Sequence, residues 1–316
     1  MHRLQKSILN KLGDNIMKIG IIGLGVISKY YVEAIKQLDS FTLSAVCDIQ
    51  KEKMSPFPEA EHYTDYRTFL EKADIDGVVI NVPNHMHYDI CRYALECGHH
   101  ICCEKPLTIE LKDADRLAER SQQVQKTLFT AFHRRYNINF LNEMKKINLS
   151  QIKSVKARYL ENIKEHAGSD SWYLEPDQCG GGCVADNGPN VFDTLSYFLG
   201  KLDVTGAQIW NNANDIDVQA VIQLKNGDGV QAQVELDWEF PHGERKDVDI
   251  TLQDGTTIHI DMLKDFEVFK SSLYHEYEEI LKDFKASIGA GNCFGESGQD
   301  AVRLVQEAYS FGRVTL

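Results

Sequence analysis

Along the first half of the chain, short apolar runs alternate with segments in which apolar residues recur at helical spacing. Residues 17–22 form a β-branched apolar run that ends at Gly23, and residues 27–38 then carry apolar side chains every three or four positions. Another apolar run, at residues 43–47, ends at Asp48. This pattern predicts a strand, a glycine turn, a helix and a second strand, which is the order that a parallel sheet requires.

The same alternation continues to about residue 135. It predicts strands at 77–82, 100–103 and 128–132, with helices around 69–70 and at 87–96 and 111–126. These strands lack polar alternation, as is typical of parallel strands that helices cover on both faces. We therefore predict that residues 1–135 form a doubly wound parallel α/β sheet, the Rossmann architecture.

Beyond Tyr136 the strands become longer and alternate apolar with polar residues. They are predicted at 152–162, 204–210, 218–224, 230–238, 248–252 and 257–260. Turn signals at 226–229, 254–255 and 241–243 join pairs of these strands, and helices at 273–288 and 297–312 close the chain. Residues 136–316 are thus predicted to be an α+β domain with a mainly antiparallel, open sheet.

Length and charge narrow the class of partner. The 316 residues suit two domains, and the formal net charge of −13 disfavours nucleic acid and anionic membranes, so a small molecule is the expected partner. No apolar run approaches the ~20 residues of a membrane span, and the first fifteen residues lack the apolar core of a secretory signal. We expect a cytoplasmic protein, although the sequence does not decide what residues 1–15 do.

The eight cysteines do not predict a metal site. They form no C-x-x-C pair and have no histidine at zinc-site spacing. Cys102 and Cys103 lie inside an apolar run, where a thiol acts as a small apolar side chain. We therefore expect no structural metal.

The first candidate site is the glycine turn after the first strand. Its sequence is Gly23-Leu24-Gly25-Val26-Ile27-Ser28, which fits G-x-G-x-x-G except for the final serine. Between a strand and a helix, such a turn holds the pyrophosphate of a dinucleotide against the helix N-terminus, and a carboxylate such as Asp48 takes the ribose hydroxyls. Because Ile49 and not an arginine follows Asp48, NAD is favoured over NADP.

Two further motifs follow buried strands. Pro83, Asn84 and His87 come after the strand at 77–82, and Glu104-Lys105-Pro106 comes directly after the strand at 100–103. Open α/β sheets bind ligands at the carboxyl ends of their strands. A charged Glu-Lys pair at this place is more typical of a site than of a solvated loop.

Together these motifs resemble the Gfo/Idh/MocA family of nicotinamide-dependent oxidoreductases. The shared features are G-x-G, P-N-x-x-H, E-K-P, and a glycine run before D-x-G-x-x-x-x-D, and they extend over nearly the whole chain. The resemblance implies an N-terminal NAD(P) domain, and a C-terminal sheet that supplies substrate contacts and subunit interfaces. It also implies hydride transfer to or from a sugar, a sugar derivative or a cyclitol.

The resemblance also suggests roles for individual residues. Lys105 would reach the reacting hydroxyl and the nicotinamide, with Glu104 shaping its turn, while Asn84 and His87 would lie beside the cofactor. Arg135 and Tyr136 would be the pair at the domain junction that faces substrate. Trp172 precedes the glycine run and could line a sugar site, and His133 is a weaker candidate for substrate contact.

The glycine run at 180–182 leads into Asp186 and Asn190, where this chain departs from the family pattern. The family usually has D-x-G-x-H, with the aspartate binding substrate and the histidine as general base, but Asn190 stands at the histidine position. An asparagine amide cannot take a proton at neutral pH. Pro189 suits the first turn of a helix that would place Asp186 and Asn190 near its positive end.

With Asn190 in place, Lys105 becomes the leading candidate base, with Asp186 as a possible second proton acceptor. Two alternatives to a dehydrogenase remain open: a non-catalytic sensor that binds NAD and a sugar, and an NAD-dependent glycoside hydrolase. An open sheet with one apolar face also suggests a homodimer or homotetramer. The sequence leaves open which sugar or cyclitol is the substrate and the direction of the reaction.

Overall fold

The computed structural model describes residues 16–167, 171–266, 269–293 and 295–315. Residues 1–15, whose role the sequence leaves open, lie outside the described residues. The chain divides into two compact units. Among the described residues, unit 1 takes those within 16–107, 112–131 and 277–298, and unit 2 takes those within 108–111, 132–276 and 299–315. Among the described residues, no helix is both long enough and apolar enough to cross a membrane.

Unit 1 is built on a parallel sheet with strand order β3-β2-β1-β4-β5-β6. Its strands are β1 (Met17–Ile22), β2 (Phe41–Cys47), β3 (Glu61–Tyr63), β4 (Gly77–Ile80), β5 (His100–Glu104) and β6 (Leu128–Ala131). The strand order reverses between β1 and β4, which is the switch point where such sheets bind ligands. The predicted Rossmann fold is confirmed, and the short edge strand β3 is the one that the apolar pattern did not indicate.

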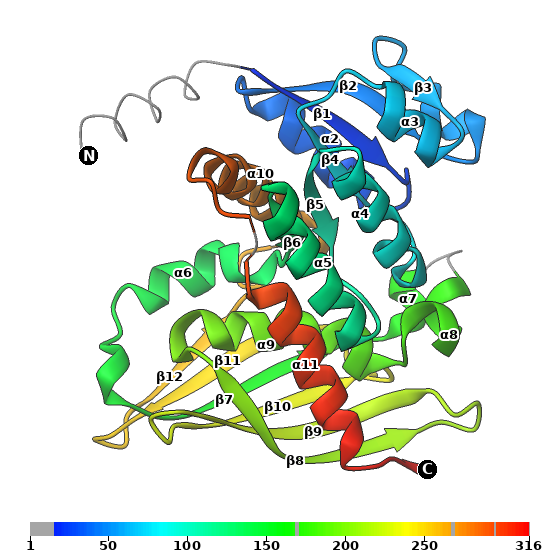
Figure 1. The fold of residues 1–316 in the computed structure, drawn as a ribbon. Helices are drawn as coiled ribbons and strands as arrows, with labels where there is room; N and C mark the ends of the chain where they lie inside the picture. Colours follow the sequence, from blue (N-terminus) through cyan, green and yellow to red (C-terminus); the bar gives the residue numbers. More distant parts are fainter. Residues whose placement is uncertain (1–15, 168–170, 267–268, 294, 316) are drawn as a thin grey trace. The chain divides into compact units, whose positions relative to one another are not determined.

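Helices cover both faces of this sheet in Figure 1. They are α2 (Ser28–Gln37), α3 (Tyr66–Lys72), α4 (His87–Glu96), α5 (Leu111–Val124) and α10 (Leu273–Gly289), with short 3₁₀ turns η1 (Lys51–Met54) and η2 (Asn84–Met86). Strand β4 is buried at every position, as its unbroken apolar run predicts.

Most of α10 belongs to unit 1, although the sequence reading placed this helix in the second domain. Tyr277 stacks on Tyr30 with ring centroids 5.5 Å apart and meets Tyr31 edge-on at 4.8 Å. Phe284 packs against Phe129, and it also faces Gly77, where a side chain would crowd it. Burial of these aromatic rings holds a C-terminal segment on the N-terminal sheet.

Unit 2 contains a mixed sheet with strand order β12-β11-β7-β10-β9-β8-β13 among the described residues. Its strands are β7 (Ile152–Leu160), β8 (Leu202–Asn211), β9 (Asp217–Asn226), β10 (Gln231–Asp237), β11 (Arg245–Leu252), β12 (Thr257–Asp261) and β13 (Val314–Thr315). Most neighbours are antiparallel, as predicted, but β7 pairs parallel with β10, and β13 pairs parallel with β8.

The turns at 226–229 and 254–255 join paired strands, β9 with β10 and β11 with β12, and these predictions are confirmed. The segment 241–243 is different. It leads from β10 to β11, but β7 lies between those two strands and pairs with both. The prediction of a hairpin there was wrong, because a local turn signal does not show that a distant strand will insert.

Helices α9 and α11 lie on one face of this sheet (Figure 1). The helices of unit 2 are α6 (Ile138–Met144), α7 (Ile163–Ala167), α8 (Pro176–Cys179), α9 (Cys183–Leu199) and α11 (Ser297–Ser310). Its 3₁₀ turns are η3 (Arg134–Tyr136), η4 (Leu149–Gln151), η5 (Ser171–Leu174) and η6 (Phe269–Ser272). The core of the unit lies between α9, α11 and the inward-facing residues of the strands, such as Ile222 and Val234.

Helix α9 begins at Cys183, six residues before the proline that was expected to open it. Asp217, at the start of β9, accepts hydrogen bonds from the Gly182 and Val184 amides at 2.7 and 2.8 Å, and so caps the helix from a distant strand. A side chain at Gly182 would clash with the Asp217 carbonyl. Pro189 therefore lies inside the helix, and Asp186, not Asn190, lies in its first turn.

The opposite face of the sheet is charged, not apolar. Lys156 and Glu235 form an ion pair of 2.6 Å there, and Arg158 binds Asp247 and Asp249 at 2.6 and 2.8 Å. The apolar face is already covered by α9 and α11. The oligomeric state stays a prediction, and an exposed apolar sheet face no longer supports it.

Candidate functional site

The glycine turn of unit 1 leaves free space at its second glycine. Gly23 has φ +88°, and a side chain there would clash with the Asn81 carbonyl oxygen. At Gly25, in contrast, an added Cβ would meet no atom within 4 Å. Packing within the protein therefore explains the glycine at position 23 but not the glycine at position 25.

Asp48 lies at the end of β2 beside this turn. Its Oδ2 accepts a hydrogen bond from the Leu24 amide at 2.8 Å, and its Oδ1 accepts one from the Gln50 amide at 2.8 Å. Ile49, the next residue, is 84% exposed. A carboxylate oxygen accepts more than one hydrogen bond, so Asp48 retains acceptor capacity for a hydroxyl.

The remaining residues of the turn begin helix α2. Ile27 is its N-cap, and no side chain caps the helix there. Ser28, in the third glycine position, is buried and donates through Oγ to the Gly25 carbonyl at 2.7 Å, which braces the loop. Val26 is 42% exposed on the outside of the turn. The arrangement can bind an anion through backbone amides and the positive end of α2.

Asn81 follows β4 and stands next to the glycine turn. Neither its amide oxygen nor its amide nitrogen has a hydrogen-bond partner among the described residues, although both atoms are buried. A buried amide without partners is destabilising, by about 1–3 kcal/mol per group. Asn81 is the first residue of the motif that continues through Pro83, Asn84 and His87, but the motif assigned it no role; its place at the carboxyl end of a central strand was the available signal.

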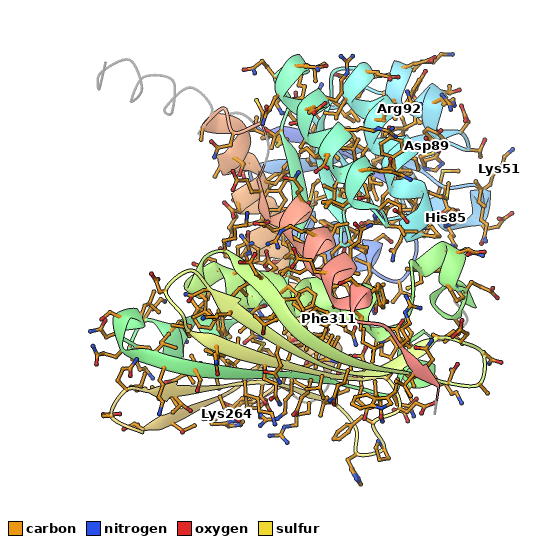
Figure 2. The ribbon with its side chains drawn as sticks, turned by 60° about the horizontal axis from the view of Figure 1, so that its bottom comes forward. Lys51, His85, Asp89, Arg92, Lys264 and Phe311 are labelled. Carbon is orange, nitrogen blue, oxygen red and sulfur yellow. The ribbon has the colours of Figure 1, made fainter. Side chains whose placement is uncertain are left out.

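His87 lies in the interior rather than at an open surface. Its Nδ1 lies 2.7 Å from the Pro106 carbonyl oxygen and its Nε2 lies 2.9 Å from that of Val82, so the ring ties the loop after β4 to the loop after β5. Burial lowers the pKa of His87 to about 4, although the carbonyl oxygens of Pro106 and Val82, of which a neutral ring donates to only one, oppose the shift. Neighbouring His85 is exposed in the 3₁₀ turn η2, just before α4 (Figure 2).

The other residues of this motif lie nearby: Pro83 precedes the 3₁₀ turn η2, and Asn84 is 3% exposed within it. Asn84 therefore has its side chain directed into the protein. His87 braces the loop that carries both residues, so we assign it a positioning role rather than direct contact with a ligand.

Glu104 ends β5 with a buried carboxylate. Its Oε1 accepts hydrogen bonds of 3.0 Å from the hydroxyls of Tyr31 and Tyr277. Burial raises the pKa of Glu104, while Lys105 and the two hydroxyls act in the opposite direction. Its Oε2 accepts from the Lys105 amide at 3.3 Å, so Glu104 fixes the backbone from which Lys105 projects.

In unit 2, Asp186 and Asn190 lie one turn apart on α9, and both are buried, with 5% and 2% of their surface exposed. The Asn190 Oδ1 atom has no hydrogen-bond partner among the described residues. Trp172, on the 3₁₀ turn η5, packs at the edge of the core. The structure thus brings Asp186 and Asn190 together on one helix, as the motif predicted.

Arg135 is bound by a carboxylate rather than left for a ligand. It forms a bidentate ion pair with Asp193, in which the Nε–Oδ2 distance is 2.7 Å. Burial raises the pKa of Asp193 to about 6, although Arg135 opposes the shift. The pair fixes η3, which also carries Tyr136, to the next turn of α9.

His133 belongs to a buried polar network that the sequence analysis did not identify. Its Nδ1 lies 2.6 Å from Oε2 of Glu276, and its Nε2 lies 3.3 Å from Nδ2 of Asn190. The other oxygen of Glu276 accepts from Arg134 at 3.0 Å and from Asn137 at 2.8 Å. Glu276 lies 143 residues beyond His133, so no local pattern could reveal the pair.

A second buried network surrounds Lys246. Its ammonium group forms an ion pair with Glu161 and lies 3.5 Å from the centre of the Tyr159 ring. The other Glu161 oxygen accepts from Asn187 of α9 at 2.9 Å. Burial lowers the pKa of Lys246 to about 8, although Glu161 opposes the shift.

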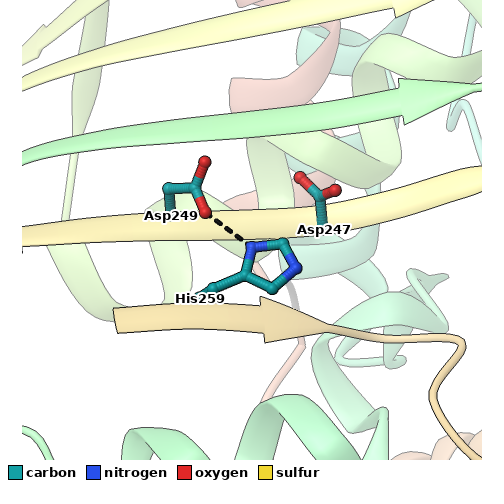
Figure 3. Close-up of side chains that lie close together, drawn as sticks. All are labelled: Asp247, Asp249 and His259. Carbon is teal, nitrogen blue, oxygen red and sulfur yellow. Dashed lines mark hydrogen bonds and ion pairs between the residues drawn. The ribbon is translucent and has the colours of Figure 1, made fainter. Parts of the chain in front are cut away.

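Asp247, Asp249 and His259 form a cluster of possible metal ligands among the described residues (Figure 3). His259 Nδ1 lies 2.6 Å from Asp249 Oδ1. However, Arg158 is already paired with both aspartates, and its positive charge would oppose a cation at the same place. The cluster is better described as part of the charged face of the sheet.

The parallel sheet, its switch point and the glycine turn define unit 1 as an NAD(P)-binding Rossmann domain. The chain belongs to the Gfo/Idh/MocA oxidoreductase family. Residues 17–132 match the model described as "Oxidoreductase family, NAD-binding Rossmann fold", and residues 146–258 match that of the "GFO/IDH/MocA C-terminal domain".

Individual relatives agree with this membership. Myo-inositol 2-dehydrogenase of Thermotoga maritima is 31% identical over 128 residues, which cover 39% of this chain and only 38% of that protein. The uncharacterized oxidoreductase YrbE of Bacillus subtilis is 27% identical over 336 aligned positions, covering 93% of this chain and 94% of YrbE. The crystal structure of GenD2 from gentamicin A biosynthesis, in complex with NAD, has a TM-score of 0.83 at 17% identity and covers 94% of both chains. At that identity, the likeness shows the fold alone.

Proposed function

We propose that this protein transfers a hydride between NAD and a carbinol or ketone carbon of a sugar, a sugar derivative or a cyclitol. The observation that carries the proposal is the glycine turn, where Gly25 faces open space and Gly23 packs against the backbone of Asn81, a residue whose buried side-chain amide has no partner among the described residues. A dinucleotide would fill the space with its pyrophosphate and could supply hydrogen-bond partners for the amide. The residues present therefore fit the cofactor.

Bound NAD supplies the hydride acceptor, and the chain must hold the substrate and take up the hydroxyl proton. In the proposed arrangement Lys105, fixed by Glu104, contacts the reacting hydroxyl. Asp186 accepts hydrogen bonds from substrate hydroxyls, and Asn190 orients the substrate. Arg135 holds Asp193 and so acts by positioning Tyr136 and α9, while Trp172 lines the substrate site.

The preference for NAD over NADP rests on Asp48. A carboxylate at the end of β2 accepts hydrogen bonds from ribose hydroxyls and repels a 2′-phosphate. The exposed Ile49 offers no positive charge to offset that repulsion, although Lys53 Nζ lies 3.9 Å from Asp48 Oδ2 and reduces it in part. Dissociation constants measured by quenching of protein fluorescence should be lower for NAD than for NADP. In Asp48→Asn the difference between the two dissociation constants should be smaller. Equal affinities in the unmodified protein would contradict the NAD assignment.

The substrate class is supported by the relative named as an inositol dehydrogenase and by the site residues themselves. Asp186 and Asn190 offer carboxylate and amide groups, which suit a ligand with several hydroxyls, and neither is a cationic group for a phosphate or carboxylate. A panel of inositols, aldoses, sugar phosphates and sugar nucleotides, scored by the absorbance of reduced cofactor, tests the proposal directly.

The same panel, extended with aryl glycosides, distinguishes the alternatives. Net formation of reduced cofactor identifies a dehydrogenase. Release of the aryl group without net reduction identifies a glycoside hydrolase. Binding of cofactor and sugar with neither reaction identifies a sensor, and either of the last two results would overturn the proposed function.

A further inference from the structure

The side chain of Asn190 lies against a histidine that is itself held by a carboxylate. Asn190 Nδ2 is 3.3 Å from His133 Nε2, and His133 Nδ1 is 2.6 Å from Glu276 Oε2. His133 is 5% exposed and Glu276 is fully buried. A ring nitrogen facing the candidate substrate residue, with the other nitrogen on a carboxylate, is the arrangement of an oriented general base.

The partners of Glu276 determine which ring nitrogen carries the proton. Burial alone would raise the pKa of Glu276, but Arg134, His133 and Asn137 outweigh it, and the net pKa lies below its ordinary value. Glu276 is therefore an ionised carboxylate that only accepts hydrogen bonds. The proton of a neutral His133 ring then resides on Nδ1, and Nε2 presents a lone pair toward Asn190.

The Asn190 amide fits this state of the ring. Nδ2 donates to the lone pair of Nε2, and this leaves Oδ1 turned away, buried and without a partner among the described residues. An orphaned acceptor beside a base is where a substrate hydroxyl would donate a hydrogen bond. After His133 is protonated, rotation of the amide would turn Oδ1 toward the new Nε2–H.

We propose that His133 is the proton acceptor of the reaction, with Glu276 as its positioning residue; this inference rests on the proposed function. During oxidation the carbinol C–H hydrogen leaves with its electron pair to the nicotinamide ring. The Asn190 amide first turns away and releases the lone pair of His133 Nε2, and the reacting hydroxyl then passes its proton to Nε2. The C–O bond becomes a carbonyl, and the proton leaves the imidazolium to water. Atoms and charge balance without any other reactant.

This assignment changes the role expected of Lys105. The sequence reading made Lys105 the base because Asn190 cannot take a proton. With His133 as the acceptor, Lys105 acts as a charged ammonium that orients the reacting hydroxyl and stabilises its developing negative charge. The two assignments differ in the group that sets the pH dependence of turnover.

The decisive variants exchange the functions of positions 133 and 190. His133→Gln keeps hydrogen-bonding groups but cannot accept a proton, so we expect kcat to fall by about a hundredfold or more while the Kd of NAD is unchanged. The acid limb of the kcat/KM profile, which reports protonation of the base in the free enzyme, should disappear with it. Adding Asn190→His to His133→Gln should restore at least about tenfold of the lost kcat, since general-base catalysis is worth ~10²–10⁴.

A matched control is His242→Gln, because His242 is an exposed histidine of the same unit. It should leave kcat and the pH profile unchanged, and thermal melting should show that every variant is folded. The substrate is the polyol of the panel that reduces NAD fastest in the unmodified protein. If no polyol is oxidised, the proposed function fails. If the unmodified protein oxidises a polyol and His133→Gln keeps both its kcat and its acid limb, the assignment of His133 alone is overturned.

Glu276 has a separate readout that does not depend on turnover. The ¹⁵N shifts of the His133 ring should show a protonated Nδ1 and an unprotonated Nε2 at neutral pH. In Glu276→Gln the side-chain amide can donate as well as accept, so a larger share of the Nε2–H tautomer should appear. An unchanged tautomer ratio in a folded Glu276→Gln protein would remove Glu276 from its positioning role.

Discussion

Lys246 of β11 and Glu161, which follows β7, form an ion pair in the interior of unit 2, where their side chains are 0% and 2% exposed. Tyr159 and Asn187 contact the pair, and the charges of Glu244 and Arg134 also act on Lys246. Neither charge has water to stabilise it, so each depends on the other.

We predict that Lys246→Met lowers the free energy of unfolding by about 3–5 kcal/mol, because Glu161 is left as an uncompensated buried charge. The double variant Lys246→Met/Glu161→Gln should recover most of that loss, since Gln is neutral and still accepts the hydrogen bond from Asn187. Urea denaturation measures both values. Additive losses in the double variant would show that the two side chains do not depend on each other.

Substitution of the two glycines of the turn at 23–28 should have different effects, one on stability and the other on cofactor binding. Gly23→Ala introduces a clash with the Asn81 carbonyl at φ +88° and should destabilise the protein by about 1 kcal/mol or more. Gly25→Ala meets no atom and should leave the melting temperature unchanged, yet weaken NAD binding at least tenfold by blocking the pyrophosphate. If Gly25→Ala binds NAD as well as the unmodified protein, the pyrophosphate does not lie at this turn.

Replacement of Lys105 should affect turnover rather than cofactor binding. In Lys105→Ala we expect kcat to fall by about a hundredfold or more, because the reacting hydroxyl loses the group that orients it, while the Kd of NAD stays within about threefold. Lys72→Ala, at an exposed lysine of the same unit, is the control. Retained turnover in Lys105→Ala would remove this residue from the active site.

His87 should make the protein less stable in acid. Its pKa is about 4 in the folded protein, against ~6.5 for an unperturbed histidine, so the unfolded chain binds the proton more readily. The contribution of neutral His87 is fully present above about pH 6.5 and is lost as the pH falls through the window from 6.5 to 4. By linkage, the free energy of unfolding falls by about 3 kcal/mol across this pH window. Denaturation of the unmodified protein and of His87→Asn at pH 7 and pH 4 measures it, and equal pH dependence in the two would contradict the prediction.

Most elements of the fold could be predicted because their signals are local. The helix His87–Glu96 was predicted with the bounds that the structure has, since its apolar spacing and the following Gly98 mark it clearly. The start of α9 could not be predicted in this way. It depends on Asp217, whose carboxylate reaches the Gly182 amide from 35 residues away.

The residues of the candidate site also differ in whether a local motif predicts them. Gly23, Gly25 and Asp48 follow from one βαβ motif, and the structure places them together. The pairs His133–Glu276 and Glu161–Lys246 each join positions more than 80 residues apart, and a buried charged side chain looks in the sequence like any surface charge. Their geometry emerges only when the chain folds.

The return of α10 to the N-terminal sheet has a consequence for dissecting this protein. A gene fragment that ended after β6 would encode all six parallel strands, but it would omit Tyr277 and Phe284. Glu104 would then lose one of its two hydroxyl donors, and the rings of Tyr30, Tyr31 and Phe129 would be left without the aromatic partners that cover them. Any graft or minimal version of the nucleotide-binding half must therefore carry two separate stretches of the gene.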